Sequence, residues 1–539
     1  MSRTAHIDTF ARDNLPPRAQ WPDLIFELPE LRYPARLNCA AELLDAMVAQ
    51  GHGERIALRT PDGACTYRQL MVRANQIAQV LREDLKLVPG NRVLLRGPNN
   101  PMMAACWLAV IKAGCIAVAT MPLLRAKELK QVIDKARIGV ALCDARLMEE
   151  MRLAQRDCAD LKRVLNFHDE GPGSLEALLA SKPAVFDNVD TAADDVAIIA
   201  FTSGTTGQPK GTMHFHRDVL AMCDSFPRSI LKPTANDIFC GTPPLAFTFG
   251  LGGMLCFPLR FGASTVLMER LLPETLLQAI QDFKATICFT APTFWRQMAP
   301  LVDRYDLSSL KKCVSAGEAL PDTTRQLWKQ ASGIEIIDGI GATEMIHIFL
   351  SHTPEKVRRG ATGYAIPGYQ ACVVDDDGNP LPAGQVGRLA VKGPTGCRYL
   401  ADERQINYVK NGWNLTGDAY RMDEDGYFFY QARTDDMIIS AGYNIAGPEV
   451  EDCLLQHPAV AECGVVGAAD EERGQIVKAY LVLRPDHAAT DALTRELQDY
   501  VKNNIAPYKY PRAVEYVDQL PRTETGKLQR FKLRSMHSS

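Results

Sequence analysis

The chain has 539 residues, a formal net charge of -4, and 46% hydrophobic and 23% charged residues, which is typical of a soluble globular protein. Its length predicts two or more domains, because a single hydrophobic core rarely extends beyond about 250–300 residues. The small negative charge gives no indication of a nucleic-acid partner.

The fifteen cysteines are scattered, with no C-x-x-C pair and no grouping with histidines at zinc-ligand spacing. We therefore expect reduced, buried thiols in a cytoplasmic protein. The first twenty residues lack the apolar core of a secretory signal, and no window reaches the ~18 apolar residues of a membrane span. Neither secretion nor a membrane partner is expected.

Strand-like and helix-like segments alternate through the first four hundred residues. Apolar runs at residues 92–97, 139–144 and 195–203 predict buried strands, and residues 101–114 predict a helix. Further strands that end in polar or glycine turns are predicted within residues 286–292 and 311–320. This alternation indicates an α/β fold with mostly parallel sheets. Ligands of such sheets bind at the carboxyl ends of the strands.

The pattern changes after "YQARTDDMIISAGYNIAG" to a smaller α+β region. A helix is predicted over residues 491–507, with apolar residues at helical spacing. Strands are predicted over residues 462–470, 475–483 and 513–517. We expect the boundary near Asp435, which gives an N-terminal domain of residues 1–434 and a C-terminal domain of residues 435–539.

The stretch "TSGTTGQPKG", residues 202–211, follows a predicted strand and is typical of a phosphate-binding loop. Small residues let backbone N–H groups converge on an anion, and the hydroxyls and Lys210 add further donors. Its spacing differs from the P-loop, which disfavours a P-loop kinase. A flexible polar turn is the alternative. The candidate phosphate-binding residues are Thr202, Ser203, Gly204, Thr205, Thr206, Gly207 and Lys210.

Three further stretches carry candidate site residues. In "DGIGATEM", Glu344 stands where a dinucleotide fingerprint needs a glycine, and a carboxylate there suits a magnesium-bound triphosphate. In "NLTGD", Asp418 either forms a turn or accepts hydrogen bonds from a ribose, and Arg433 in "ARTDD" is a possible phosphate or ribose partner. Lys527 in "PRTETGKLQR" is either a solvated lysine or a catalytic one.

Together, "TSGTTGQPKG", "GIGATEM", "NLTGD", "ARTDDMIISAGYNI" and "PRTETGKLQR" resemble, in this order, the acyl-adenylate-forming superfamily. That superfamily includes acyl- and aryl-CoA synthetases, adenylation domains and beetle luciferases. The resemblance spans nearly the whole chain and implies a large N-terminal domain with a mobile C-terminal lid, hinged at Asp435. It implies two half-reactions: a carboxylate attacks ATP to give acyl-AMP and pyrophosphate, and a thiol, reached near Gly442, then takes the acyl group.

The resemblance also implies a role for each matched residue. The loop at residues 202–211 would hold the β- and γ-phosphates, Glu344 would bind Mg²⁺, and Thr343 would contact the α-phosphate. Lys527 would bridge the substrate carboxylate and the α-phosphate, where a lysine and a metal ion stabilise the developing charge. No general base is needed, because the nucleophile is already ionised. The adenine and ribose contacts would be Gly317, Glu318, Asp338, Gly339, Asp418 and Arg433.

The acyl pocket implied by the resemblance is largely apolar, which favours a compact, flat aromatic acid. The segment "PLAFTFGLGG" contains no aspartate to pair with a buried ammonium, which argues against α-amino acids. An aryl amine is neutral at pH 7 and is not excluded. The pocket residues would be Phe247, Thr248, Phe249, Gly341, His347 and Ile348.

Within the superfamily, the chain is most similar to benzoate- and 2-aminobenzoate-CoA ligases, through "FGLGG", "GATEMIHIFLS" and the N-terminal segment. Benzoate ligases read closer to A-Y-G where this chain has T-F-G, so 2-aminobenzoate is favoured and benzoate is next. His347 or Thr248 would accept a hydrogen bond from the amine, unless His347 only packs beside the nucleotide turn. The expected cofactors are ATP and Mg²⁺, CoA is the co-substrate, and the protein is a monomer or homodimer.

Two other functions stay open. A free-standing adenylation enzyme would load an aryl group onto a carrier protein, whose phosphopantetheine arm is the same as that of CoA. A non-catalytic nucleotide-binding regulator would have lost the site chemistry. The presence of Lys210, Glu344, Asp418 and Lys527 disfavours the regulator.

Overall fold

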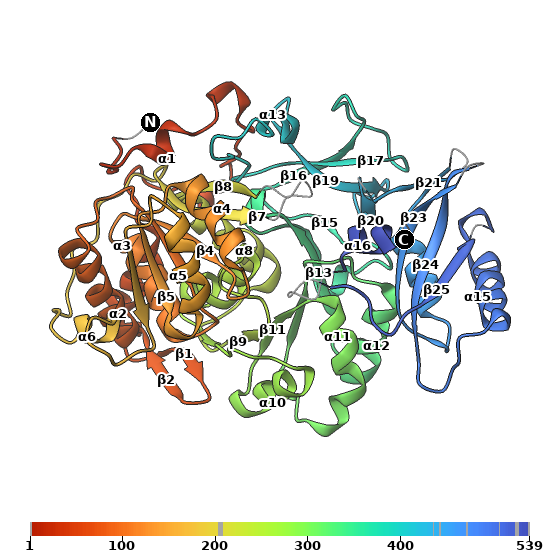
Figure 1. The fold of residues 1–539 in the computed structure, drawn as a ribbon, viewed down its shortest axis with the longest axis horizontal. Helices are drawn as coiled ribbons and strands as arrows, with labels where there is room; N and C mark the ends of the chain where they lie inside the picture. The colour runs from red at the N-terminus through yellow and green to blue at the C-terminus, as the bar shows by residue number, and fades with distance from the viewer. Residues whose placement is uncertain are drawn as a thin grey trace.

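The computed structural model describes residues 3–202, 209–434, 436–440, 443–470, 473–505, 507–522 and 528–536. Figure 1 shows a large N-terminal part that contains several sheets and a smaller C-terminal part, in blue, at the right. None of the described helices is long and apolar enough to cross a membrane. Cys65 and Cys372 are half-buried, the other cysteines are buried, and all are free thiols, as expected.

The first sheet has the strand order β6-β5-β3-β4-β7-β8. Its neighbours are parallel except for β7 and β8, which form an antiparallel pair. The strands are β3 (Arg92–Arg96), β4 (Ile116–Thr120), β5 (Val140–Asp144), β6 (Arg163–Phe167), β7 (Val196–Thr202) and β8 (Lys210–Phe215). The strands predicted over residues 92–97, 139–144 and 195–203 are therefore confirmed.

Helix α3 (Pro101–Lys112) follows β3 and confirms the helix predicted over residues 101–114. It begins where the Asn100 side chain accepts a hydrogen bond from the Met103 backbone N–H, and Pro101 suits a first turn that needs no donor. Every residue after Pro101 is buried. Because a helix that is apolar on all faces belongs inside a protein, α3 packs into the main core.

The second sheet has the strand order β15-β14-β13-β12-β11-β9-β10-β1-β2. The strands from β13 to β1 are parallel, and antiparallel strands flank them. The strands are β1 (Ile56–Thr60), β2 (Gly63–Thr66), β9 (Ile238–Gly241), β10 (Ser264–Val266), β11 (Ile287–Thr290), β12 (Lys312–Ser315), β13 (Ile336–Gly341), β14 (Ile348–Ser351) and β15 (Tyr364–Ala365). The strands predicted within residues 286–292 and 311–320 are confirmed as β11 and β12.

An antiparallel sheet covers the top of the N-terminal part in Figure 1. Its strands are β16 (Gln370–Val374), β17 (Val386–Lys392), β18 (Val409–Lys410), β19 (Trp413–Met422) and β20 (Phe428–Arg433). β19 is the central strand and pairs antiparallel with each of β17, β18 and β20. This sheet connects the N-terminal part to the C-terminal part.

The C-terminal part is α+β and has its own core. β21 (Ile438–Ser440) pairs with β22 (Tyr443–Ile445), and β24 lies between β23 and β25. The other elements are β23 (Val460–Asp470), β24 (Gly474–Leu483), β25 (Ala513–Tyr516), α14 (Gly447–Leu455), α15 (Asp491–Asn504) and α16 (Arg530–Ser535). Their main apolar cluster is separate from the N-terminal clusters. The predicted fold class, a large domain of mostly parallel sheets and a small α+β domain, is confirmed.

A fully buried ion pair joins distant segments of the N-terminal part. Arg398 Nη1 lies 2.8 Å from Asp218 Oδ2, on helix α7 (His216–Asp224). Burial alone would raise the pKa of Asp218, but the charge of Arg398 and further contacts hold it below its usual range. Asp218 is therefore ionised, and its negative charge balances the positive charge of Arg398 in the core.

We expect Asp218→Ala to destabilise the protein by about 3–5 kcal/mol, because it leaves a buried guanidinium without its partner. Thermal unfolding followed by fluorescence should show a clear fall in Tm. Glu54→Ala is the matched control, because it removes the acid of the exposed Arg68–Glu54 pair and should change Tm little. An equal effect of the two substitutions would contradict a special role for the buried pair.

Candidate active site

The expected phosphate-binding loop connects two paired strands. β7 ends at Thr202 and β8 begins at Lys210, and these residues are opposite each other in the antiparallel register. The buried Thr202 Oγ1 has no hydrogen-bond partner among the described residues. The other predicted loop residues lie outside the described residues: Ser203, Gly204, Thr205, Thr206 and Gly207.

Lys210 and Glu344 come from distant segments and meet beside this loop. Lys210 Nζ lies 3.6 Å from Glu344 Oε1, and Glu344 is buried. Tyr399 completes the group, because its Oη donates to Glu344 Oε1 at 2.5 Å and accepts from Lys210 Nζ at 3.0 Å. The sequence predicted the lysine and the carboxylate but missed Tyr399, because "GCRYLAD" carries no motif or spacing that marks it.

The turn that carries Glu344 is η10 (Thr343–Met345), and strand β8 fixes it. His214, fully buried on β8, donates from Nε2 to the backbone carbonyl of Thr343 at 2.7 Å. The turn ends at Ile346, whose φ of 66° is unusual for a β-branched residue. Such strain persists where the surrounding structure fixes the backbone. β8 therefore positions both Lys210 and, through His214, the turn of Glu344.

Two of the predicted nucleotide residues face each other on β19 and β20. Asp418 is opposite Arg433 in the antiparallel register, and Arg433 Nη1 donates to Asp418 Oδ1 at 3.1 Å. A carboxylate oriented by an arginine is a strong acceptor for neighbouring hydroxyl groups. The structure thus brings together the two residues that the sequence predicted near a ribose.

Two tyrosines, Tyr408 and Tyr420, lie within electrostatic range of the predicted carboxylates. Burial and then the charge of Glu344 raise the pKa of Tyr408, and Asp418 adds to the shift. Burial and then Asp418 raise the pKa of Tyr420, and Asp338 adds to that shift. Of the three carboxylates, Asp418 acts on both phenols. The sequence could not show this, because the tyrosines have no common spacing.

Asp338 lies on β13 and presents a buried acceptor. Its backbone N–H donates to His352 Nε2 at 3.2 Å, and its carbonyl accepts from Ser351 Oγ at 2.6 Å. Its side-chain Oδ1 is buried and has no partner among the described residues. Burial raises the pKa of Asp338 to about 8. The neighbouring Gly339 lies against Ile348.

The loop after β12 carries Gly317 and Glu318 and contacts the C-terminal part. Thr293 Oγ1 donates to Glu318 Oε2 at 3.0 Å. Arg522 Nη1 lies 3.8 Å from Glu318 Oε1 and donates to Thr293 Oγ1 at 3.3 Å. Because Arg522 precedes Lys527 by five residues, the chain that leads to this lysine contacts the edge of the predicted nucleotide site.

Lys527, Asp435 and Gly442 lie outside the described residues. Beside the predicted hinge, Asp436 forms an ion pair with Arg534 of α16. This ion pair connects the first residues of the C-terminal part to helix α16.

His347 lies in an aromatic cluster, with its ring 4.5 Å from Phe257 and 5.6 Å from Phe249. Its Nε2 donates to the Phe249 carbonyl at 3.3 Å, and its buried Nδ1 has no partner among the described residues. Burial lowers the pKa of His347 to about 3, so the ring is neutral and Nδ1 is an acceptor. Gly252 and Gly341 permit this close packing, because a Cβ at either would lie within 2.7 Å of His347.

The predicted acyl-pocket residues fall into two neighbouring groups. Phe247 and Thr248 line a small apolar cavity with Trp107, Ala117 and Ile198, whereas Phe249 and His347 form the aromatic cluster. The cavity is about 20 Å³, the space of about one water molecule. An aromatic acid is larger, so its binding here would require side chains to move.

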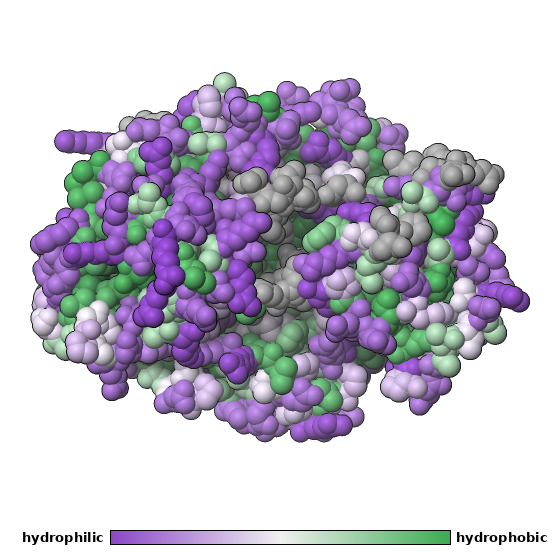
Figure 2. All heavy atoms as spheres, viewed as in Figure 1, coloured by the Kyte–Doolittle hydropathy of each residue, from purple (hydrophilic) through white to green (hydrophobic). Residues whose placement is uncertain are grey.

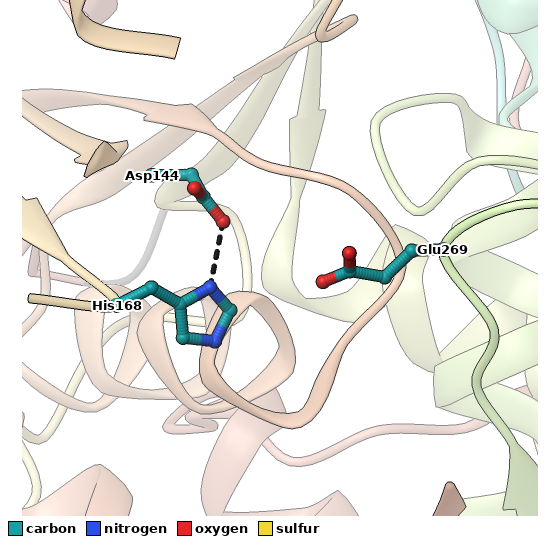
Figure 3. A group of neighbouring side chains, drawn as sticks. All are labelled: Asp144, His168 and Glu269. Carbon is teal, nitrogen blue, oxygen red and sulfur yellow. Dashed lines mark hydrogen bonds and ion pairs between the residues drawn. The ribbon is translucent and has the colours of Figure 1, made fainter. Parts of the chain in front are cut away.

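A further group of titratable side chains lies outside the predicted site. Figure 3 shows Asp144 and His168 pointing toward each other, with Glu269 approaching from a separate segment. His168 Nδ1 lies 2.7 Å from Asp144 Oδ2. Arg146 Nη2 also contacts Asp144 and Glu269, at 2.7 and 2.8 Å. Because the guanidinium already supplies the cationic charge, this group is an ion-pair network rather than a metal centre.

Figure 2 shows a mainly hydrophilic face with a hollow near its middle, between the N-terminal part on the left and the C-terminal part on the right. In Figure 1, the same region lies between β13 and β20.

Residues 46–399 match the family described as AMP-binding enzyme, and residues 449–527 match the AMP-binding enzyme C-terminal domain. This chain belongs to the AMP-binding enzyme family. The sequence-based recognition of the family is thereby confirmed, as is the enzyme class of AMP-forming acid–thiol ligases.

Relatives of this AMP-binding enzyme cover nearly its whole length. The benzoate–CoA ligase of Thauera aromatica is 35% identical over 94% of this chain and 97% of its own. An uncharacterized acyl–CoA ligase of Bacillus subtilis is 35% identical over 87% of this chain and 90% of its own. A crystal structure of an anthranilate–CoA ligase in complex with anthranoyl-AMP is 34% identical, with a TM-score of 0.90 over 95% of this chain and 99% of its own.

In this AMP-binding enzyme we expect Asp338 to make stability pH-dependent. Between about pH 4 and 8 the folded protein keeps a proton on Asp338 that the unfolded chain releases, so stability falls as the pH rises. Asp338→Asn removes this dependence. Its Tm relative to wild type should be similar near pH 4 and increase toward pH 9. A Tm difference that does not change with pH would contradict the assigned titration.

Proposed function

We propose that this chain is an ATP-dependent aryl-CoA ligase. It activates an aromatic carboxylate as acyl-AMP, with release of pyrophosphate, and then transfers the acyl group to CoA. The observation that carries this proposal is the meeting of Lys210 with Glu344, three residues before His347, whose ring lies in an aromatic cluster. A phosphate-binding lysine, a carboxylate and an apolar pocket are the parts that acid activation by ATP requires.

We further propose 2-aminobenzoate as the preferred acid and benzoate as the next. The similarity to an anthranilate–CoA ligase supports 2-aminobenzoate, which is the same compound as anthranilate, and the similarity to a benzoate–CoA ligase supports benzoate as the other candidate. The neutral His347 Nδ1 also supports it, since a buried acceptor without a partner gains most from a ligand N–H. Thr248, in the adjoining cavity, offers a second acceptor.

The nucleotide would be held by residues from several strands. Thr202 and Lys210, together with residues 203–207, would bind the β- and γ-phosphates. Asp418 and Arg433 would hold the ribose. The adenine would lie against Gly317, Glu318 and Gly339, with the unpartnered Asp338 Oδ1 accepting from its exocyclic amine.

Glu344 fits a magnesium ion. Its Oε1 is engaged by Tyr399 and Lys210, whereas no hydrogen bond to its Oε2 occurs within the described part of the chain. Mg²⁺ prefers one or two carboxylates together with phosphate oxygens, which this arrangement allows. When bound, the ion would neutralise phosphate charge during attack on the α-phosphorus.

The lid would supply the second positive charge. Lys527 would contact both the carboxylate and the α-phosphate, with Thr343 on the other side of the phosphate. We propose that the domain boundary and the hinge lie at Asp435. After the lid has turned, CoA would approach near Gly442. We also propose that the protein is a monomer or homodimer. A cytoplasmic location is part of the proposal and is supported by the free and mostly buried thiols.

The acid preference can be tested with benzoate, 2-aminobenzoate and hydroxybenzoates, each with ATP and CoA. We expect the highest kcat/KM for 2-aminobenzoate. His347→Leu or Thr248→Val should lower the ratio of 2-aminobenzoate to benzoate by about 10-fold, the value of one hydrogen bond. An unchanged ratio in both variants would contradict amine recognition, and product formation only with a carrier protein would contradict CoA as the acceptor.

We expect Lys527→Ala to reduce acyl-AMP formation by about 10²–10³-fold, because it removes a charge that stabilises the transition state. Thioester formation from supplied aroyl-AMP and CoA should continue. Acid-dependent exchange of labelled pyrophosphate into ATP measures the first step separately from the second. Lys532→Ala, an exposed lysine on α16, is the matched control. Equal loss of both steps would argue against the assigned role.

A further inference from the structure

We propose that Tyr399 is a positioning residue that keeps Glu344 and Lys210 apart and correctly oriented for a magnesium–ATP complex. This inference rests on the proposed roles of Glu344 and Lys210. It adds a residue that the sequence motifs do not include, because Tyr399 lies outside the motif-bearing segments.

Tyr399 is the one member of the three-residue group that can connect the other two by hydrogen bonds. The Glu344 carboxylate only accepts and the Lys210 ammonium only donates, whereas a phenol does both. Lys210 Nζ donates to the Tyr399 hydroxyl at 3.0 Å, and the hydroxyl donates to Glu344 Oε1 at 2.5 Å. An ordinary phenol keeps its proton at neutral pH, so the Tyr399 hydroxyl can donate to the carboxylate.

The backbone around Tyr399 is fixed to strand β8. Tyr399 forms an antiparallel bridge with Thr212, and the Leu400 N–H donates to the Gly211 carbonyl at 2.8 Å. The Tyr399 N–H donates to Gln405 Oε1 at 2.9 Å. The phenol is therefore pre-organised on the strand that also begins with Lys210, and it needs little ordering when a ligand binds.

The phenol also prevents a competing contact. Lys210 Nζ and Glu344 Oε1 are 3.6 Å apart, within ion-pair range but longer than a direct charged hydrogen bond. Without the hydroxyl, the two groups would close onto each other. That pair would turn the Glu344 carboxylate away from its present orientation and would neutralise the lysine charge that a phosphate needs. Hydrogen-bonded partners of ligating carboxylates tune metal affinity in this way.

The test compares Tyr399→Phe with Tyr408→Phe in the full-length protein. Tyr408 is the matched control, because its ring packs 5.8 Å from that of Tyr399 and its buried hydroxyl has no partner among the described residues. Calorimetry measures ATP binding at a series of Mg²⁺ concentrations, and Tm is measured without ligand. We expect Tyr399→Phe to raise the half-saturating Mg²⁺ concentration at least about 10-fold, with KM for the aromatic acid unchanged. Tyr408→Phe should change neither.

Equal effects of the two phenylalanine variants would overturn the proposal, as would an unchanged Mg²⁺ dependence in Tyr399→Phe. Glu344→Gln separates this inference from the proposed function. If Glu344→Gln weakens Mg²⁺-dependent ATP binding but Tyr399→Phe does not, only the role of Tyr399 is wrong. If Glu344→Gln has no effect either, the assignment of Glu344 to the metal fails as well.

Discussion

A buried carboxylate must be matched by a positive charge or by hydrogen-bond donors, and Glu344 places this demand at the short turn that follows β13. Lys210 and Tyr399 meet it from two other segments. His214 fixes the backbone of the same turn from β8. The paired strands β7 and β8 therefore hold a lysine, a histidine and, through a backbone bridge, a tyrosine around one acid.

Parallel strands bring Glu318 and Asp338, two further predicted site residues, to the same edge of the second sheet. β11, β12 and β13 are parallel neighbours, with Thr290 beside Ser315 and Ser315 beside Asp338, so their following loops open at one edge. That edge carries Glu318 and the unpartnered acceptor of Asp338. Leaving such an acceptor buried costs stability unless a ligand supplies a donor. The unpartnered acceptor of Asp338 therefore lowers the stability of the fold locally, at the place where a nucleotide is proposed to bind.

The C-terminal domain has its own core but also touches the edge of the site. Arg522 contacts Glu318 and Thr293 across the domain junction, and Arg534 pairs with Asp436 beside the predicted hinge. These are polar contacts at partly exposed side chains, which are individually weak. A junction of this kind can be broken and remade, which suits a domain proposed to change position between two half-reactions.

The sequence by itself determined the strands, the α/β class, the small second domain and the family, because apolar periodicity and glycine- and hydroxyl-rich motifs are local properties of the chain. It also marked Lys210, Glu344, Asp418 and Arg433. Only the tertiary structure revealed Tyr399 and His214, which lie in segments without a motif and act through contacts between distant strands. It also decided that His347 is a neutral ring and that Asp338 holds its proton to about pH 8, since burial, which sets both pKa values, exists only after the chain has packed.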